Sequence, residues 1–159
     1  MADRFHTIEA YPERQDANGV VMRLIDGLGY RFYWATEGLT GDDYGFTPGA
    51  GCQTISGLIG HVCGLINWLH IHVIGEGAGS RSPDPAGQRL QALDLLAAVR
   101  DRVAALDEAA LFALRIDGDP FWHMVNGPFS DALTHVGQIA SFRRLHGNPV
   151  PRHDVFLGQ

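Results

Sequence analysis

The chain contains no lysine. All 12 basic residues are arginine, and 18 acidic residues bring the formal net charge of the 159 residues to −6. Without lysine, Schiff-base catalysis and the lysine-dependent P-loop are excluded. An acidic chain whose largest basic cluster is Arg143-Arg144 also makes a poor binder of nucleic-acid phosphates. We therefore expect neither lysine chemistry nor a nucleic-acid partner.

Cysteine is scarce as well. Cys52 and Cys63 are the two cysteines, and the second lies inside an apolar helical pattern. This spacing and setting make a disulfide framework implausible and suit a reducing compartment. The N-terminus also lacks the basic segment followed by an apolar stretch that marks a secretory signal. We predict a cytoplasmic location.

Charge is absent from residues 44–75, which include no Asp, Glu, Lys or Arg. The helical part of this stretch is nevertheless interrupted by His61, Asn67, His70 and His72. Such side chains would be unfavourable on a helix that faces lipid. We interpret the segment as the central buried helix of a soluble protein and expect no membrane partner.

Helical periodicity of apolar residues appears four times, and convincing strand alternation appears nowhere. Steps of three and four predict helices over 16–38, 54–74, 88–105 and from about 128 to 146. A Gly-rich loop over 41–51 and a short helical turn over 121–124 separate them. The connector 75–87 is long enough for a crossover. We predict an all-α fold, a single four-helix-bundle domain over residues 1–159 with a long crossover connection.

Histidine, with eight copies, is the main chemical signal. His6, His153 and His146 lie in the tails or at a helix end, and we expect them to be solvated. His61 and His72 face the same way on one helix but lie roughly 16 Å apart along its axis, since each residue rises 1.5 Å. They cannot share one metal ion.

Asp131, His135 and Gln138 follow steps of four and three and therefore share one helix face. A carboxylate and an imidazole spaced in this way can close on one divalent ion. The alternative is a surface Asp–His pair that supports the helix. His61, which lies inside an otherwise apolar and uncharged run, is either a satisfied core histidine or a third ligand. A buried imidazole and a buried Asp–His pair would more comfortably share a cation than remain unpaired.

Two segments resemble a known family. Residues 54–61, which end in His61, are similar to the second helix of the DinB-like metalloprotein superfamily of four-helix bundles. Residues 131–139, followed by Arg143-Arg144 and Gly147-Asn148-Pro149, resemble that family's fourth-helix signature. The signature is H-x-x-x-H, then a small residue, Gln and a hydrophobe, with an Arg and Gly-x-Pro downstream. The resemblance covers the whole chain in helix order and is most specific in the last 35 residues.

The resemblance implies a bundle with a long crossover, frequent homodimers and one divalent ion held by three side chains between helices. Asp131 stands where many members carry the first histidine of the pair. The implied metal ligands are therefore His61, Asp131 and His135, a set that suits Zn, Ni, Mn or Fe(II). Alternatively, Asp131 orients a histidine, and only two ligands remain, which would bind metal weakly.

Neighbouring residues extend the hypothesis. Gln138 is expected to hold a metal-bound water or orient a ligand, or else to make a helix-capping or inter-helix hydrogen bond. Trp68 is a candidate wall of the substrate pocket, with a core position as the alternative. Arg143 and Arg144 are candidate contacts for an anionic substrate or a partner subunit, with a solvated helix end as the alternative. Asn126, which precedes Gly127-Pro128, is expected to cap the fourth helix.

The leading functional hypothesis is a metal-dependent enzyme whose ion generates a nucleophile by lowering the pKa of a bound water or thiol. The family resemblance favours a thiol-dependent transferase or a small-molecule hydrolase, with a low-molecular-weight thiol as a candidate substrate and a homodimer as the assembly. Two alternatives stay open. One is a non-catalytic homodimeric binding protein in which Asp131 and His135 only hydrogen-bond, and the other is a metal that merely staples the bundle.

Overall fold

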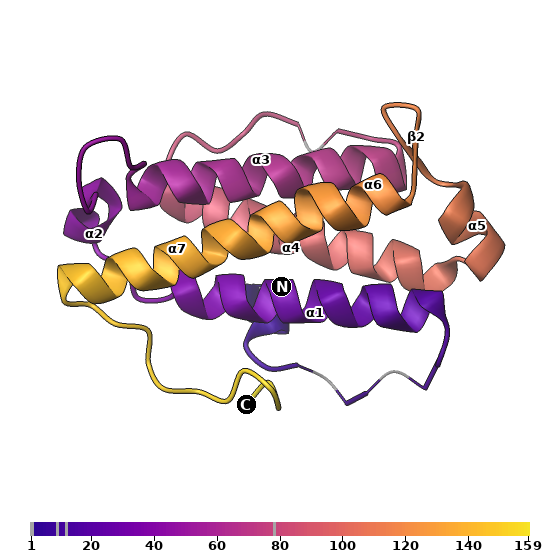
Figure 1. Ribbon diagram of the computed structural model, residues 1–159, viewed down its shortest axis with the longest axis horizontal. Helices are drawn as coiled ribbons and strands as arrows, with labels where there is room; N and C mark the ends of the chain where they lie inside the picture. Colours follow the sequence, from indigo (N-terminus) through magenta and orange to yellow (C-terminus); the bar gives the residue numbers. More distant parts are fainter. Residues whose placement is uncertain (1, 9, 12, 78) are drawn as a thin grey trace.

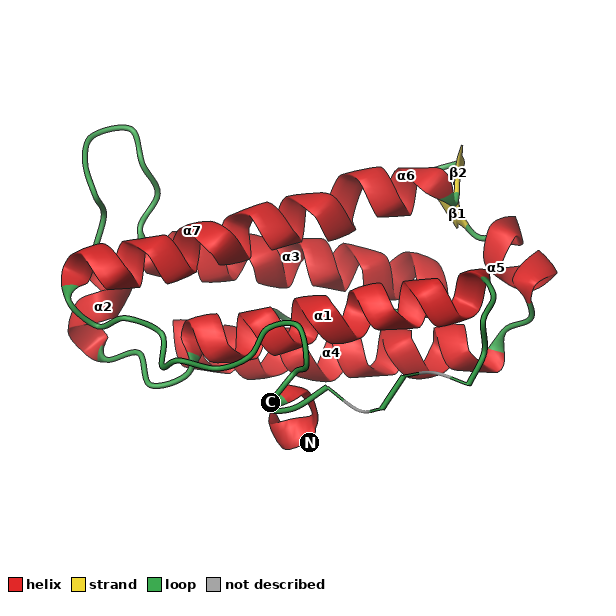
Figure 2. Ribbon diagram, turned by 60° about the horizontal axis from the view of Figure 1, so that its bottom comes forward, coloured by secondary structure: helices red, strands yellow, loops and turns green. Residues whose placement is uncertain are grey.

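The structure is a computed structural model that describes residues 2–8, 10–11, 13–77 and 79–159. The described residues are mostly helical, in agreement with the predicted all-α class (Figures 1 and 2). The four longest helices are α1 (Ala17–Thr36), α3 (Ile55–Ile74), α4 (Pro85–Ala105) and α7 (Ser130–His146). The short elements are η1 (Ala2–Phe5), α2 (Gly41–Gly45), α5 (Glu108–Ala113), β1 (Arg115–Ile116), β2 (Asp119–Pro120), α6 (Trp122–Met124) and η2 (Val125–Phe129).

Each long helix packs against two others. α3 contacts α4 and α7, and α1 contacts the same two helices, so that the four enclose a common core. In Figure 1, α1 and α7 run in one direction and α3 and α4 in the other. The connector between α3 and α4 runs back along α3 (Figure 1). Its Arg81 side chain consequently lies against Gly60, near the start of α3. This path is the crossover connection that the length of the connector 75–87 allowed.

Side-chain caps begin three of the long helices. Asp16, Thr54 and Asp84 each accept a hydrogen bond from the N–H three residues later, which satisfies one free donor of the first turn. α4 begins three residues before the predicted start. Pro85 occupies its first position, where the missing proline N–H costs nothing.

α3 is the central helix of the core. The residues on its apolar stripe are almost completely buried, and its polar residues lie outside that stripe. By length and composition α3 could also cross a membrane, and 44% of its most apolar window is buried inside the protein. The core helix of a soluble protein has the same length and composition. The buried members are Ile55, Leu58, Ile59, Val62, Cys63, Ile66, Leu69 and Val73.

Two connecting segments differ from the prediction. The loop expected over 41–51 begins with the helical turn α2, because Thr40 and Asp43 form a reciprocal capping box. The strands β1 and β2 form a two-residue antiparallel pair. They are connected by a tight turn at Asp117-Gly118, where both residues have positive φ. Strand alternation cannot reveal such a short pair, since two residues contain no period.

The start of the fourth long helix also differs. Residues 122–146 run as one helical segment through η2, a π-helical turn that holds Pro128 in its interior. The prediction that Asn126 caps this helix is therefore wrong, because no helix begins there. The wide turn accommodates the missing N–H of Pro128, and Ser130 Oγ donates to the carbonyl of Val125 at 2.9 Å. The turn ends at Phe129, two residues before Asp131.

Of the three histidines expected to be solvated, His6 and His146 are exposed and His153 is half-buried, and all three also contact neighbouring side chains. The His153 ring stacks on Trp34 with centroids 5.1 Å apart, and the His6 ring lies 4.9 Å from the same indole. His146 Nε2 lies 3.9 Å from an Asp43 carboxylate oxygen. Trp34 sits on the outer side of α1, where it offers the two tails an apolar surface. The N- and C-terminal segments consequently pack on the same helix (Figure 2).

Arg143 joins the C-terminal ends of α7 and α1. Its side chain is only 2% exposed, and its guanidinium donates to the carbonyls of Trp34, Ala35 and Glu37 at 2.9–3.2 Å. It also donates to the main-chain and side-chain oxygens of Asn148 at 2.7 and 3.1 Å. The expectation that Arg143 contacts substrate is wrong, because its side chain is buried and its donors are occupied by oxygen atoms of the protein.

Replacing Arg143 should destabilise the fold strongly. Arg143→Ala leaves several buried carbonyls without a donor, so we expect a loss of about 3 kcal/mol or more in the free energy of unfolding. The neighbouring Arg144 is exposed, and Arg144→Ala should change stability by less than about 0.5 kcal/mol. Urea unfolding followed by circular dichroism measures both. Equal effects of the two variants would contradict the structural role of Arg143.

Asp43 is buried beside this junction. Burial alone would raise the pKa of its carboxyl, but the N–H of Thr40, the amide of Asn148 and the hydroxyl of Thr40 all donate to it and lower the pKa overall. The ionised form therefore stabilises the folded state. This contribution is present above the unfolded-state pKa of about 3.9 and is lost as the pH falls through the lower folded-state value.

The variant Asp43→Asn should reveal this linkage. We expect it to be less stable than the wild type at pH 7, since the amide cannot replace a carboxylate that accepts from Thr40 and Asn148. The difference should shrink below about pH 4, where the wild-type carboxyl also becomes protonated. Unfolding free energies measured from pH 7 to pH 2.5 provide the comparison. A difference that stays constant over this range would refute the linkage.

Candidate metal centre

The structure brings together the three side chains that the sequence singled out as ligands. α3 supplies His61, and α7 supplies Asp131 and His135. Asp131 lies between the two imidazoles, with one oxygen 3.2 Å from His61 Nε2 and the other 3.3 Å from His135 Nε2. One ligand atom from each residue lies within 4.8 Å of the other two. Within the described part of the chain, this is the group of three such side chains that could share one ion.

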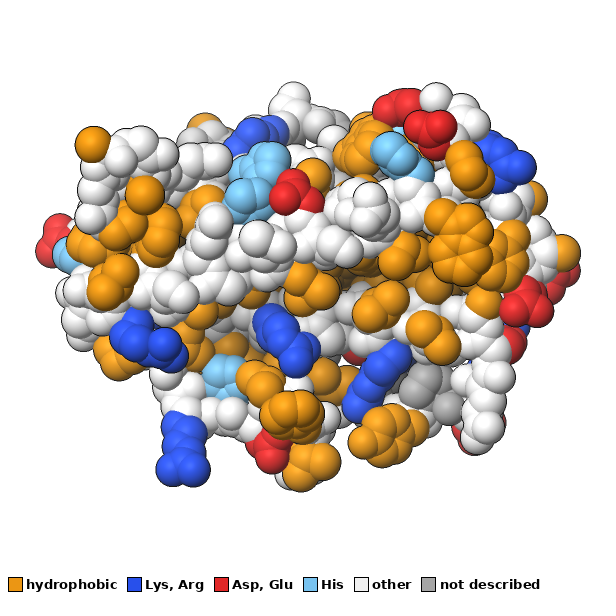
Figure 3. Space-filling view, viewed as in Figure 1, with side chains coloured by type: hydrophobic (Ala, Val, Ile, Leu, Met, Phe, Trp, Pro, Cys, Tyr) orange, Lys and Arg blue, Asp and Glu red, His pale blue; other side chains and the backbone are white. Residues whose placement is uncertain are grey.

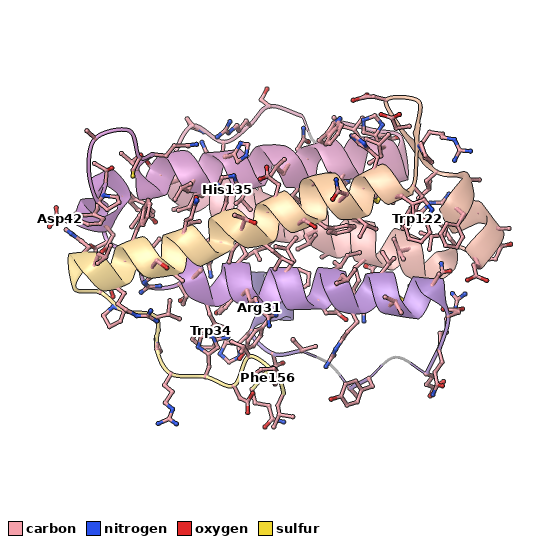
Figure 4. The ribbon with its side chains drawn as sticks, viewed as in Figure 1. Arg31, Trp34, Asp42, Trp122, His135 and Phe156 are labelled. Atoms are coloured by element: carbon pink, nitrogen blue, oxygen red, sulfur yellow. The ribbon has the colours of Figure 1, made fainter. Side chains whose placement is uncertain are left out.

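The site lies at the surface between α3 and α7. Histidine side chains gather there beside an acidic one in Figure 3, and His135 points from α7 toward α3 in Figure 4. The His61 and Asp131 side chains are 42% and 46% exposed, and His135 is 17% exposed. The expectation of a buried imidazole and a buried Asp–His pair is therefore wrong. The apolar stripe of α3 faces the core, and His61 lies at its edge.

A fourth residue orients His135. Its Nδ1 lies 2.8 Å from Gln138 Oε1, an oxygen that only accepts hydrogen bonds, so Nδ1 carries a proton. In the neutral ring this arrangement leaves the lone pair on Nε2, the atom that faces Asp131. Gln138 thus makes a hydrogen bond within α7 to the histidine, and the expected inter-helix hydrogen bond is absent from the described contacts.

A cavity of about 230 Å³ adjoins His135 and Gln138. Its other walls combine the loop before α3 with the C-terminal half of α7. Phe142 could have been found from the sequence, because it lies four residues after Gln138 on the same face. The loop residues could not, since loop geometry depends on packing. The additional lining residues are Gly51, Cys52, Gln53, Leu58 and Phe142.

Trp68 lies away from this cavity. Its ring contacts His72 and His123, with centroids 5.5 and 6.1 Å apart. His72 pairs with Asp117 at 3.3 Å, and His123 lies 3.7 Å from a carboxylate oxygen of Asp119. The expectation that Trp68 walls the pocket is wrong, because two turns of α3 separate it from His61. These pairs do not form a group of three around one point.

The chain was compared with models of known families, with curated proteins and with solved structures, and none of them matched. The chemistry of the site must therefore be argued from the site itself.

The hydrogen bond of Gln138 predicts the tautomer of His135. At pH 8.5, nitrogen-15 chemical shifts should show His135 protonated at Nδ1, whereas a free imidazole prefers the Nε2 proton. Gln138→Ala should return His135 toward that ordinary mixture. His70 is an internal control, since its Nδ1 lies 2.9 Å from the Glu76 carbonyl and its signals should not move. A proton on Nε2 of His135 in the wild type would contradict the assignment.

Proposed function

We propose that the protein is a metal-dependent enzyme, built on a DinB-like four-helix bundle, that holds one divalent ion with His61, Asp131 and His135. The observation that carries the proposal is the convergence of two imidazole nitrogens and a carboxylate from two helices at one half-exposed point. The packing of α1, α3, α4 and α7 around one core and the crossover before α4 support the bundle.

The hydrogen bonding around the site favours a cation. With its proton on Nδ1, a neutral His135 directs a lone pair at Asp131, and two acceptors then face each other at 3.3 Å. Such a contact is repulsive unless a positive charge lies between the two atoms. A proton on His135 or a metal ion supplies it. His61 Nε2 lies 3.2 Å from the second carboxylate oxygen, where it can donate a hydrogen bond in one tautomer or bind a cation in the other, so one ion would satisfy all three groups.

The donor set fits Zn, Ni, Mn or Fe(II), because two imidazoles and one carboxylate leave positions open for water or substrate. When bound, the ion would lower the pKa of a coordinated water or thiol and so supply a nucleophile. Gln138 would hold the His135 ring in the orientation that presents Nε2. Asp131 would neutralise part of the charge of the ion.

The adjoining cavity indicates the size of the substrate. A volume of about 230 Å³ accommodates a small molecule, and its walls combine the amides of Gln53 and Gln138 with the apolar groups of Leu58 and Phe142. These walls suit a compact substrate with polar and apolar parts. Together with the family resemblance, they support transfer of a low-molecular-weight thiol or hydrolysis of a small molecule, in a cytoplasmic homodimer.

Metal content tests the proposal. Protein purified without an affinity tag or chelator, then supplied with Zn, Ni, Mn or Fe(II), should hold close to one equivalent per chain by elemental mass spectrometry. His135→Ala and Asp131→Ala should lose it, since fewer than three ligands bind weakly. Activity toward thiol and ester or amide substrates should disappear in the same variants.

His123→Ala is the matched control. It removes a histidine from another Asp–His pair with the same four-residue spacing, so metal stoichiometry should remain that of the wild type. Persistent absence of metal in the wild type would favour the non-catalytic binding protein instead. Bound metal that raises the melting temperature but has no exchangeable water ligand would favour a purely structural metal site.

A further inference from the structure

A second cavity, separate from the metal centre, lies where the C-terminal segment crosses α1 and α7. Its volume is about 410 Å³, within the range of about 300–1,000 Å³ that is usual for small-molecule sites. It shares no residue with the three candidate metal ligands or with the cavity beside them. Its walls come from α1, α7 and residues 150–155.

The interior of this cavity is apolar. Ala35 of α1 and Leu133, Val136 and Ala140 of α7 form one side, and Val150 and Val155 of the C-terminal segment form the other. Gly137 adds a gap in the α7 wall, because no atom lies within 4 Å of the position that a side chain would occupy. Hydrocarbon would gain favourable burial against such walls.

The charged lining residues of the cavity are Arg31 and Arg144, and no acidic residue lines it. Arg31 folds back along α1, where its Nη1 donates to the carbonyl of Gly27 at 3.1 Å (Figure 4). Among the described residues, neither arginine pairs with a carboxylate. Arg31 Nη2 also donates to the carbonyl of Val155 at 3.4 Å. In a chain of net charge −6, two guanidinium groups without a carboxylate partner at one apolar cavity are an unusual concentration of positive charge.

The C-terminal wall is held in place. Tyr30 Oη donates to the carbonyls of Asp154 and Gln159 at 3.3 and 3.0 Å, and the N–H of Ile8 donates to the carbonyl of Gly158 at 3.0 Å. The His153 ring, which also lines the cavity, stacks on Trp34. These contacts anchor the segment from His153 to Gln159, so its lining residues His153 and Val155 are held in place without a ligand.

We propose that this cavity binds a small amphipathic carboxylate, with its hydrocarbon part between α1, α7 and the C-terminal segment and its carboxylate held by Arg31 and Arg144. Guanidinium groups recognise carboxylates through paired N–H donors, and the apolar walls select against a compact inorganic anion. The site is independent of the metal centre, and its ligand is not a substrate of that centre.

Titration calorimetry with sodium decanoate tests the proposal on the full chain. We expect one decanoate per chain, and Arg31→Gln and Arg144→Gln should each weaken binding by about tenfold or more, as expected for loss of a charge-assisted hydrogen bond. Arg102→Gln, which removes the same charge from the exposed end of α4, should leave affinity unchanged. Decanol, which has the chain without the charge, should bind more weakly than decanoate.

A second pair of variants tests the position of the ligand. Gly137→Phe should fill the cavity and abolish decanoate binding, whereas Gly137→Ala adds one methyl group and should keep it. His135→Ala should also keep it, which separates this site from the metal centre. Circular dichroism and sedimentation equilibrium establish the fold and the mass of each variant.

Three results would overturn the proposal. The first is no decanoate binding at millimolar concentration, and the second is equal weakening by Arg31→Gln and Arg102→Gln. The third is that the wild type is a dimer that does not bind decanoate and that Gly137→Phe converts it to a monomer. This result would show that a second copy of the chain covers the cavity.

Discussion

The buried guanidinium of Arg143 is the interaction on which the arrangement of the helices depends. It satisfies the last free carbonyls of α1 and the oxygens of Asn148 from within α7, so the ends of both helices meet around one charged group. Asn148 then extends the junction to the carboxylate of Asp43 in α2. A buried charge with so many oriented partners permits few alternative positions for α7. The residues along α7 are consequently held in one register against α1 and α3.

In this register, two faces of α7 line two different regions of the molecule. His135, Gln138 and Phe142 follow one face of the helix and meet α3 and the loop before it. Val136, Ala140 and Arg144 follow another face and meet α1 and the C-terminal segment. The π-helical turn that holds Pro128 ends at Phe129, directly before α7, so Asp131 lies in the first turn of that helix. The two regions differ in chemistry because one gathers nitrogen and carboxylate ligands, while the other gathers apolar side chains and arginine.

The three candidate ligands are closer to solvent than a core histidine cluster would be. This exposure leaves the three groups open to solvent, and it lowers the cost of keeping a carboxylate between two imidazoles. The hydrogen bond from His135 to Gln138 adds the orientation that an exposed ring would otherwise lack. A hydrogen bond within α7 therefore orients the His135 ring, and the position of the site at the surface leaves it accessible to solvent.

The sequence by itself determined the long helices and singled out the three side chains of the candidate metal centre. Apolar residues at steps of three and four locate α1, α3 and α4 to within a few residues, and the spacing of Asp131, His135 and Gln138 places them on one face whatever surrounds the helix. Short elements were missed, because the capping box of α2 and the two-residue strands carry no periodicity. The role of Arg143, the displacement of Trp68 from the site and the contacts of the tail histidines were decided only by the tertiary structure. Each depends on which segments distant in sequence lie side by side. The local sequence pattern cannot predict such contacts, because it relates a residue only to its neighbours along the same helix.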